Sequence, residues 1–249
     1  MRSVDTGAAL PRLPEGLVIF DCDGVLIDSE PLSAALLSEA LTAAGYPITG
    51  AEIHARFTGF TTAEMVEMLV AEDGVKNPGP IIEAWRAKLF PAFAQELQPV
   101  PGIAALLDAL DRPICVASNS GVVRLDRSLG VLPIRAAFGP HVYSAEMVAR
   151  PKPAPDLVHL CLERMAVSAD EAVMVDDSPH GIEAAVAAGV AAIGFVTPGD
   201  TRPARERVLR EAGALAVVTS AADLATLLGV PMADAAAEIH GAPNRAAAS

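Results

Sequence analysis

Short apolar runs alternate with longer helical patterns along most of this chain. The runs are nearly continuous rather than alternating in polarity, which is typical of parallel strands covered on both faces. Helices on both sides of one sheet would provide that cover, so we predict an α/β fold with a Rossmann-like parallel sheet. The predicted strands lie at residues 18–20, 114–116, 173–175, 193–196 and 217–218.

The stretch between residues 31 and 99 has a different pattern. Its apolar residues recur at helical spacing, as in Leu32, Leu36 and Leu37, and it contains no strand-like run. Pro99 and the breakers that follow it end this pattern, and the sheet pattern then resumes with a predicted helix over residues 103–110. A helical domain inserted after the first strand is therefore predicted.

These breaks divide the chain into two domains. We predict a discontinuous α/β core of residues 16–30 and 100–232, and a helical cap of residues 31–99, with hinges near Glu30 and Val100. Residues 1–15 and 233–249 are rich in alanine and helix breakers, and we expect them to be flexible extensions.

Composition and charge narrow the function classes. The 249 residues are 52% apolar, which is enough for a large buried core. A net charge of −13 and the lack of clustered Lys and Arg argue against a nucleic-acid partner, because binding phosphate backbones needs such clusters. The longest apolar stretch, residues 184–196, contains two glycines and is shorter than the roughly 18 residues of a membrane-spanning helix. We expect a soluble protein with no membrane partner.

The termini and the cysteines suggest a cytoplasmic protein. The first sixteen residues contain acids and helix breakers without a compact apolar region, so they do not resemble a secretory signal. Cys22, Cys115 and Cys161 are odd in number and lack zinc-site spacing. We expect buried free thiols, as in a reducing compartment.

Two carboxylates follow the first predicted strand. Asp21 and Asp23 lie two residues apart where the run Leu17-Val18-Ile19-Phe20 ends in a loop, and loops at strand ends commonly carry catalytic side chains. Two acids in one turn repel each other and are costly to desolvate. A metal cation and an anionic substrate would explain their presence.

Three further polar motifs are spread along the predicted core. Because the carboxyl ends of parallel strands point to one edge of a sheet, motifs that are distant in sequence can converge there. Each has an ordinary alternative: a helix cap for the serine motif and for the acid pair, and a solvated loop residue for the lysine. The three are Ser118-Asn119-Ser120-Gly121, Lys152 between Pro151 and Pro153, and Asp176-Asp177 after the third strand.

The order and spacing of the four motifs resemble the haloacid dehalogenase (HAD) superfamily of phosphohydrolases. The likeness covers roughly residues 16 to 230, and the helical insert, together with Asp28-Ser29-Glu30, resembles the branch that contains β-phosphoglucomutase and bacterial sugar-phosphate phosphatases. The matching motifs are Asp21-Cys22-Asp23-Gly24-Val25, Ser118-Asn119, Lys152-Pro153 and Asp176-Asp177-Ser178.

This resemblance implies a magnesium-dependent phosphatase that acts on small phosphorylated metabolites, with sugar or sugar-acid phosphates preferred. Asp21 would attack phosphorus to form an aspartyl phosphate, and Asp23 would protonate the leaving alkoxide and then activate water. Mutual repulsion and burial would favour the proton on Asp23. Ser118 and Lys152 would hold the transferring phosphoryl oxygens, and the main chain of Asn119 would help.

The resemblance also implies the metal ligands. Mg²⁺ would be bound by Asp21, by the backbone carbonyl of Asp23 and by Asp177. Asp176 would be a ligand either directly or through an intermediary. Carboxylate oxygens are the donors that this hard cation prefers.

The helical insert would act as a lid that excludes water and binds the part of the substrate that does not react. Arg56, Thr58 and Gly59 form our candidate substrate loop, because a turn glycine between threonines lets backbone and hydroxyl groups approach a polar ligand. Arg56 could equally be a solvated helix-end residue, and Gly59 a helix cap. At most one of Arg86 and Lys88 should reach the site, because their spacing places them on different helix faces. One lid closing on one core needs no second subunit, so we expect a monomer.

Three alternative functions remain. The resembling phosphosugar mutases carry a histidine where this chain has Ser33, which favours hydrolysis. A dehalogenase would need neither Asp23 nor Asp177, and a catalytically silent binding protein could lose any of the motif residues, all of which are present. We expect His54 and His180 to be structural, since Asp23 already provides acid and base catalysis.

Overall fold

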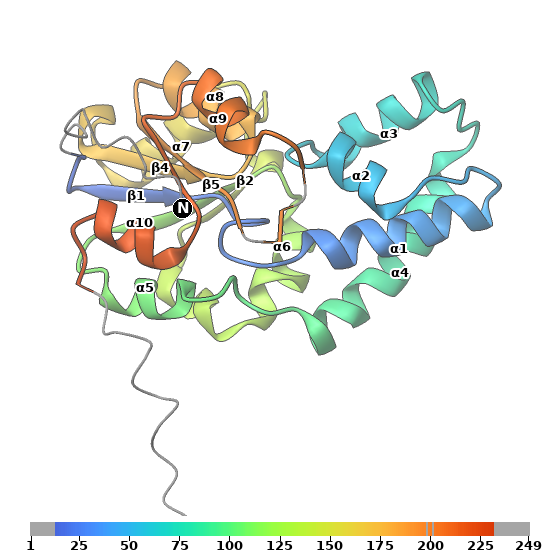
Figure 1. Cartoon of the computed structure of the whole chain (residues 1–249), viewed down its shortest axis with the longest axis horizontal. Coiled ribbons are helices and arrows are strands. Elements are labelled where there is room, and N and C mark those ends of the chain that lie inside the picture. Colours follow the sequence, from blue (N-terminus) through green and yellow to red (C-terminus); the bar gives the residue numbers. More distant parts are fainter. Residues whose placement is uncertain (1–12, 198, 201, 232–249) are drawn as a thin grey trace, which may run out of the picture.

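A computed structural model describes residues 13–197, 199–200 and 202–231. They form a six-stranded parallel sheet, in the order β3-β2-β1-β4-β5-β6, with helices on both faces (Figure 1). The predicted α/β fold with a Rossmann-like sheet is therefore confirmed. The strands are β1 (Leu17–Phe20), β2 (Ile114–Ser118), β3 (Val142–Ser144), β4 (Ala172–Asp176), β5 (Ala191–Phe195) and β6 (Ala216–Val218). The predicted terminal extensions lie outside the described residues, apart from residues 13–15.

Successive residues of β1 face opposite layers, which explains why the run is apolar throughout. Val18 and Phe20 belong to the cluster under the helices of residues 103–109 and 221–227, whereas Leu17 and Ile19 belong to the cluster under those of residues 156–165 and 179–187. Both faces of the strand are therefore shielded from solvent. The helices of the core are α5 (Ile103–Ala109), α6 (Val122–Arg127), α7 (Asp156–Met165), α8 (Pro179–Ala187), α9 (Arg205–Glu211) and α10 (Ala221–Leu227).

The sequence did not predict strand β3. It has only three residues and lies at the edge of the sheet, paired with β2 through Ser118 and Ser144 at its end. A short edge strand needs no long apolar run, so periodicity gives no signal for it. Short 3-10 turns surround it and precede β4, at Leu129–Val131, Pro133–Phe138, Ala145–Met147 and Ala169–Glu171.

Between β1 and α5 the chain forms four helices that lie beside the sheet rather than on its faces (Figure 1). Capping boxes begin two of them, with Thr49 paired to Glu52 and Thr61 paired to Glu64. Because the four are placed together, we refer to them as the helical segment. They are α1 (Glu30–Ala43), α2 (Gly50–Phe57), α3 (Thr62–Ala71) and α4 (Pro78–Glu96).

The chain enters and leaves the helical segment at neighbouring points. The amide of Asp28 donates a hydrogen bond to the carbonyl of Gln98 over 3.1 Å, and the amide of Val100 donates one to Leu26 over 3.0 Å. These bonds join the loop after β1 to the segment before α5. The two connections therefore run side by side at the edge of the core.

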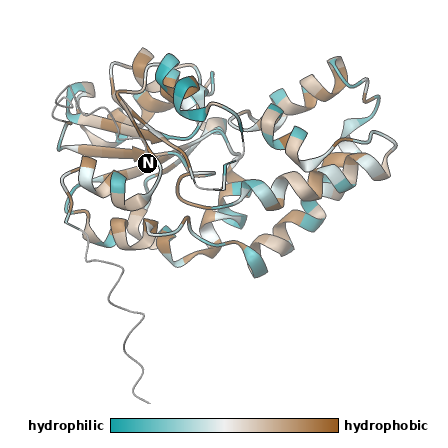
Figure 2. Cartoon of the chain, in the orientation of Figure 1, coloured by the Kyte–Doolittle hydropathy of each residue, from teal (hydrophilic) through white to brown (hydrophobic). Residues whose placement is uncertain are grey.

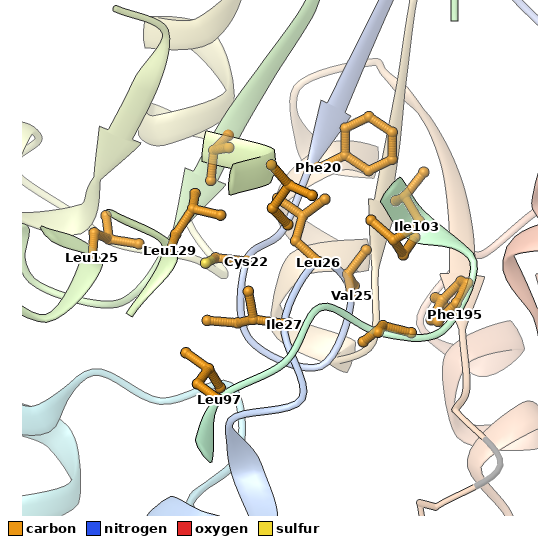
Figure 3. Close-up of a cluster of buried hydrophobic side chains, with 14 of the residues drawn as sticks. Phe20, Cys22, Val25, Leu26, Ile27, Leu97, Ile103, Leu125, Leu129 and Phe195 are labelled. Carbon is orange, nitrogen blue, oxygen red and sulfur yellow. The ribbon is translucent and has the colours of Figure 1, made fainter. Parts of the chain in front are cut away.

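One apolar cluster continues from the sheet into this junction. Figure 3 shows Phe20 of β1, Leu26 and Ile27 of the following loop, and Leu97 from the end of the helical segment, all buried in the same cluster. Figure 2 shows the same concentration of apolar residues along the strands. The loop that carries the first acid pair is thus fixed by hydrophobic packing. Among the described helices, none combines the length and the apolar character needed to cross a membrane.

Candidate active site

The sheet order brings three of the four motifs to one edge. Strand β1 lies between β2 and β4, with Phe20 paired to Val116 on one side and to Val175 on the other. The residues that follow these strands therefore emerge together at the carboxyl edge. They are Asp21 after β1, Ser118 at the end of β2, and Asp176-Asp177 at the end of β4.

Lys152 reaches the same place from the loop before α7. Its Nζ lies 2.6 Å from Oδ1 of Asp21 and 2.8 Å from Oδ2 of Asp176, and it donates to the carbonyl of Ala117 over 2.9 Å. Burial alone would lower the pKa of Lys152, but Asp176 and Asp21 outweigh it and raise that pKa. The ammonium group is thus a fixed positive charge between two buried carboxylates.

Three carboxylates form a compact, buried acidic cluster. One oxygen from each of Asp21, Asp176 and Asp177 can be chosen so that all lie within 4.8 Å of one another. Burial raises the pKa of Asp21 and that of Asp177, and Asp176 adds to both effects, while Lys152 and Arg202 oppose them. A hard divalent cation takes carboxylate oxygens and would offset this charge, so the donor set fits such an ion.

Gly24 lets the loop after β1 approach this cluster closely. Its φ is +78°, and a Cβ atom there would lie 2.7 Å from Oδ2 of Asp177. Only glycine adopts that conformation without strain and leaves that space free. The glycine of the first motif thus brings the loop after β1 against the carboxylate of the fourth.

Asp23 lies apart from the acidic cluster, with its carboxylate held by a different set of donors. Its Oδ1 accepts hydrogen bonds from Ser29 and, over 3.0 Å, from Nη2 of Arg124, and its Oδ2 accepts one from Ser120 over 2.7 Å. Burial would raise the pKa of Asp23, but Arg124 and the two hydroxyls outweigh it and hold that pKa below its usual range. We expected the proton of the pair to favour Asp23. In the structure Arg124 favours its carboxylate form instead.

The residues after β2 hold other parts of the site in place. The Asn119 side chain donates to the carbonyls of Gly59 and Lys152, both over 2.9 Å, and accepts from the amide of Lys152 over 3.0 Å. The buried Ser118 hydroxyl accepts a hydrogen bond from the amide of Ser120 over 3.1 Å. Asn119 therefore connects the lysine loop to the helical segment through its side chain, not only through its main chain.

The structure brings part of the predicted substrate loop to the site. Thr58 and Gly59 line a cavity of about 100 Å³ together with Asp23, Asn119 and Arg124. A larger cavity of about 830 Å³ adjoins it, and the two share Thr61, Thr62, Trp85, Asn119 and Arg124 as lining residues. The space next to Asp23 is therefore enclosed by core and helical-segment residues.

Arg56 is not brought to these cavities. Its guanidinium binds Asp73 through Nη1 at 2.9 Å and Glu72 through Nη2 at 2.8 Å. These acids follow α3, and Arg56 lines neither of the two cavities. Of the other two cations considered, Arg86 lines the larger cavity, whereas Lys88 is exposed and pairs with Glu39.

Several residues near the site gave no signal in the sequence. Arg124 lies on α6 and Arg202 in the loop before α9, and each contacts a motif aspartate although neither belongs to a motif. The sequence pattern singled out neither of them. A distant arginine can be assigned to a site only when the fold shows where its long side chain reaches.

The two histidines have protein partners. His180 packs edge-on against Phe60 at 4.4 Å between ring centroids, and His54 lies 3.4 Å from Glu30 and 3.5 Å from Asp200. Both hold the helical segment against the core. A structural role for both histidines stays a prediction, because His54 also lines the smaller cavity.

Comparisons with known proteins find close likeness over most of the chain. The family model described as haloacid dehalogenase-like hydrolase matches residues 18–195. The 6-phosphogluconate phosphatase of Escherichia coli (strain K12) is 30% identical over 187 residues, covering 75% of this chain and 85% of that protein. The phosphorylated carbohydrates phosphatase of Thermotoga maritima is 30% identical over 208 residues, covering 81% and 93%.

Solved structures share the fold as well. A haloacid dehalogenase-like protein from Agrobacterium tumefaciens has a TM-score of 0.75 and 36% identity, covering 86% of this chain and 97% of that chain. The likeness therefore extends over both the sheet and the helical segment.

Proposed function

Because this chain belongs to the haloacid dehalogenase-like hydrolase family and is a phosphoric monoester hydrolase, we propose that it releases phosphate from sugar or sugar-acid phosphates, with Mg²⁺ as cofactor and an aspartyl phosphate as intermediate. One observation carries the proposal. Lys152 and the acidic cluster of Asp21, Asp176 and Asp177 place a fixed cation and a candidate metal site around one carboxylate at the carboxyl edge of the sheet.

Asp21 is the proposed nucleophile. One of its carboxylate oxygens would attack phosphorus in line with the leaving oxygen, forming the aspartyl phosphate. Lys152 and Ser118 would hold the equatorial phosphoryl oxygens, and charge stabilisation of this kind supplies most of the rate enhancement in phosphoryl transfer. Bound at the acidic cluster by Asp21, Asp177 and the backbone carbonyl of Asp23, Mg²⁺ would keep Asp21 ionised and neutralise phosphoryl charge.

Asp23 is the proposed acid and base. Its contact with Arg124 favours the carboxylate, which is the form needed to take a proton from water when the intermediate is hydrolysed. For the first step Asp23 must instead carry a proton to the leaving alkoxide. The negative charge of a bound phosphate ester favours that protonated form.

We propose that residues 31–99, which include all of the helical segment except Glu30, act as a cap over this chemistry. The contact of Gly59 with Asn119 and the shared lining of the two cavities support this role. Thr58 and Gly59 would contact the part of the substrate that does not react. Ser33 lines the smaller cavity, at the position where the resembling mutases carry a histidine, which supports hydrolysis over phosphosugar transfer. The enzyme would act as a monomer.

A panel of phosphate esters tests this function. Phosphate release from 6-phosphogluconate, hexose phosphates, phosphoglycolate and β-glucose 1-phosphate would be measured with Mg²⁺ and with chelator, for the wild type and Asp21→Asn. Asp108→Asn, at an exposed position of α5, is the matched control. We expect Mg²⁺-dependent release that Asp21→Asn abolishes and Asp108→Asn leaves unchanged. Equal, slow release by wild type and Asp21→Asn would refute the proposal, and conversion of β-glucose 1-phosphate to glucose 6-phosphate without release would indicate a mutase.

A further inference from the structure

A second group of charged side chains lies between Asp177 and the helical segment. At its centre, Nη2 of Arg202 is 2.7 Å from Oδ2 of Asp177 and 2.7 Å from Oδ2 of Asp200, and Nε of Arg202 is 2.8 Å from Oδ1 of Asp200. The Arg202 side chain is 7% exposed. A buried guanidinium is thus bound to a proposed metal ligand, although no motif includes it.

The same guanidinium also faces an acid of the helical segment. Oε2 of Glu30, at the start of α1, lies 3.8 Å from Nη2 of Arg202. His54 of α2 lies between Glu30 and Asp200, at 3.4 and 3.5 Å. Arg202 therefore has Asp177 of the core as its closer partner and Glu30 of the helical segment as its more distant one.

The charges around the acidic cluster show what Arg202 does there. Lys152 neutralises Asp21 and Asp176 by direct contact, whereas Asp177 relies on Arg202 for its side-chain partner. Arg205 contributes by donating to the main-chain carbonyl of Asp177. Of the three carboxylates in the acidic cluster, Asp177 is the one that Lys152 does not contact. Among the described residues, Arg202 is the cation that pairs with its side chain.

A divalent cation and this guanidinium would repel each other if both contacted Asp177. Unit charges a few ångströms apart in a buried site interact strongly, and both cations would draw on the same Asp177 carboxylate. Asp200 also binds Arg202 through Nε, and this bond can keep the side chain in place when Nη2 leaves Asp177. Glu30 is the acid toward which Nη2 can then turn.

We propose that Arg202 competes with the divalent cation for Asp177 and thereby sets the metal affinity of the site, its guanidinium moving to Glu30 when the metal binds. This rests on the proposed metal site. Arg202 is a positioning residue in this scheme, because it acts on the metal ligand and not on the substrate. Metal binding would then strengthen one ion pair between the core and the helical segment.

Binding of Mn²⁺, a spectroscopic substitute for Mg²⁺, tests the competition without any reaction. Free Mn²⁺ would be measured by electron paramagnetic resonance during titration of the full-length protein, with circular dichroism to check folding. The variants are Arg202→Met, Glu30→Gln, both together, and Arg207→Met as the matched control, since Arg207 is exposed on α9 and pairs with Glu211. We expect Arg202→Met to bind Mn²⁺ about tenfold more tightly, within the usual range of coupling between two sites.

Glu30→Gln removes the alternative partner and should weaken Mn²⁺ binding several-fold, with a smaller effect in the Arg202→Met background. Weaker or unchanged binding in Arg202→Met would overturn the proposal, as would equal effects of Glu30→Gln in both backgrounds. If Arg202→Met does not fold, Glu30→Gln alone decides, and unchanged binding in it overturns the proposal. Asp177→Asn tests the proposed metal site separately from the competition with Arg202. If Asp177→Asn binds Mn²⁺ as tightly as the wild type, the proposed metal site itself is refuted.

Discussion

Arg124 and Asp23 form a direct ion pair, with Nη2 of the arginine 3.0 Å from Oδ1 of the aspartate. The same guanidinium lies over the rings of Trp85, at 5.7 Å, and Phe93, at 5.4 Å, both on α4. One side chain of the core thus connects the proposed acid and base to a helix of the helical segment.

Replacing Arg124 by Gln should raise the pKa of Asp23. Because Arg124 holds that pKa low, Asp23 of the wild type stays ionised to lower pH. Without the arginine, Asp23 takes up its proton at a higher pH, so the acidic limb of kcat moves to higher pH. We expect a shift of roughly 0.5 to 1 pH unit, which corresponds to the interaction free energy of a partly exposed ion pair. The measurement is kcat for p-nitrophenyl phosphate from pH 4 to 8. Arg127→Gln, on the exposed side of the same helix, should leave the limb in place, and an equal shift in both variants would contradict the assignment.

Asp23→Asn should discriminate between leaving groups. An alkoxide needs a proton as it leaves, whereas p-nitrophenolate does not, and kcat/KM reports the steps up to formation of the aspartyl phosphate. We expect kcat/KM to fall by about 10² to 10⁴ for an alkyl phosphate and far less for p-nitrophenyl phosphate. Asp28→Asn, at an exposed position of the same loop, is the control. Equal losses for both esters would show that Asp23 does not act as the acid.

Gly59→Ala should impair catalysis through a steric contact as well as backbone strain. The φ of Gly59 is +87°, and a Cβ there would lie 2.7 Å from Cβ of Ser178 in the fourth motif. Gly45 has a φ of +89° and nothing within 4 Å of its Cβ position, so Gly45→Ala isolates the conformational strain. Each substitution should cost about 1 kcal/mol of unfolding free energy for the strained backbone. Only Gly59→Ala should also lower kcat/KM, because the added Cβ pushes the loop away from the site. A similar loss of kcat/KM in Gly45→Ala would show that backbone strain alone causes the effect.

Asp200→Asn should reduce stability in a pH-dependent way. Burial would raise the pKa of Asp200, but hydrogen bonds from His54 and Arg202 outweigh it and hold that pKa far below its usual value. A lowered folded-state pKa contributes stability that is fully present above the unfolded pKa, near 4, and is lost as the pH falls through the folded one. Urea unfolding at pH 7 and 5 should therefore show a loss of about 1 to 3 kcal/mol. The loss should shrink below pH 4, and one that grows there would contradict the sign.

The sequence was sufficient for the sheet and for the motif residues at its edge, because both follow from local pattern. Apolar runs mark strands that are buried on both faces, and the strand order then brings Asp21, Asp176 and Asp177 together. The edge strand β3 has no such run and was missed. The assignment of catalytic and metal-binding roles to these residues, and the cap boundaries, stay predictions.

Long side chains account for what the sequence could not predict. Arg124 and Arg202 reach the site from positions that look solvent-facing in a linear pattern, and Arg56, which seemed placed for substrate, finds Glu72 and Asp73 instead. The tip of an arginine lies so far from its backbone that its partner is decided by tertiary packing. The periodicity of the sequence predicts only the element that carries the arginine and the face from which its side chain starts.

The adjacent connections of the helical segment would let the proposed recognition surface change independently of the chemistry. Since Asp28 and Gln98 are joined by a hydrogen bond, any folded insert whose ends lie equally close could replace the intervening residues without moving β1 or β2. The catalytic edge would then persist while the surface that faces the substrate is exchanged as one module. Such a chain can acquire new substrates by exchange of the whole insert as well as by point substitution.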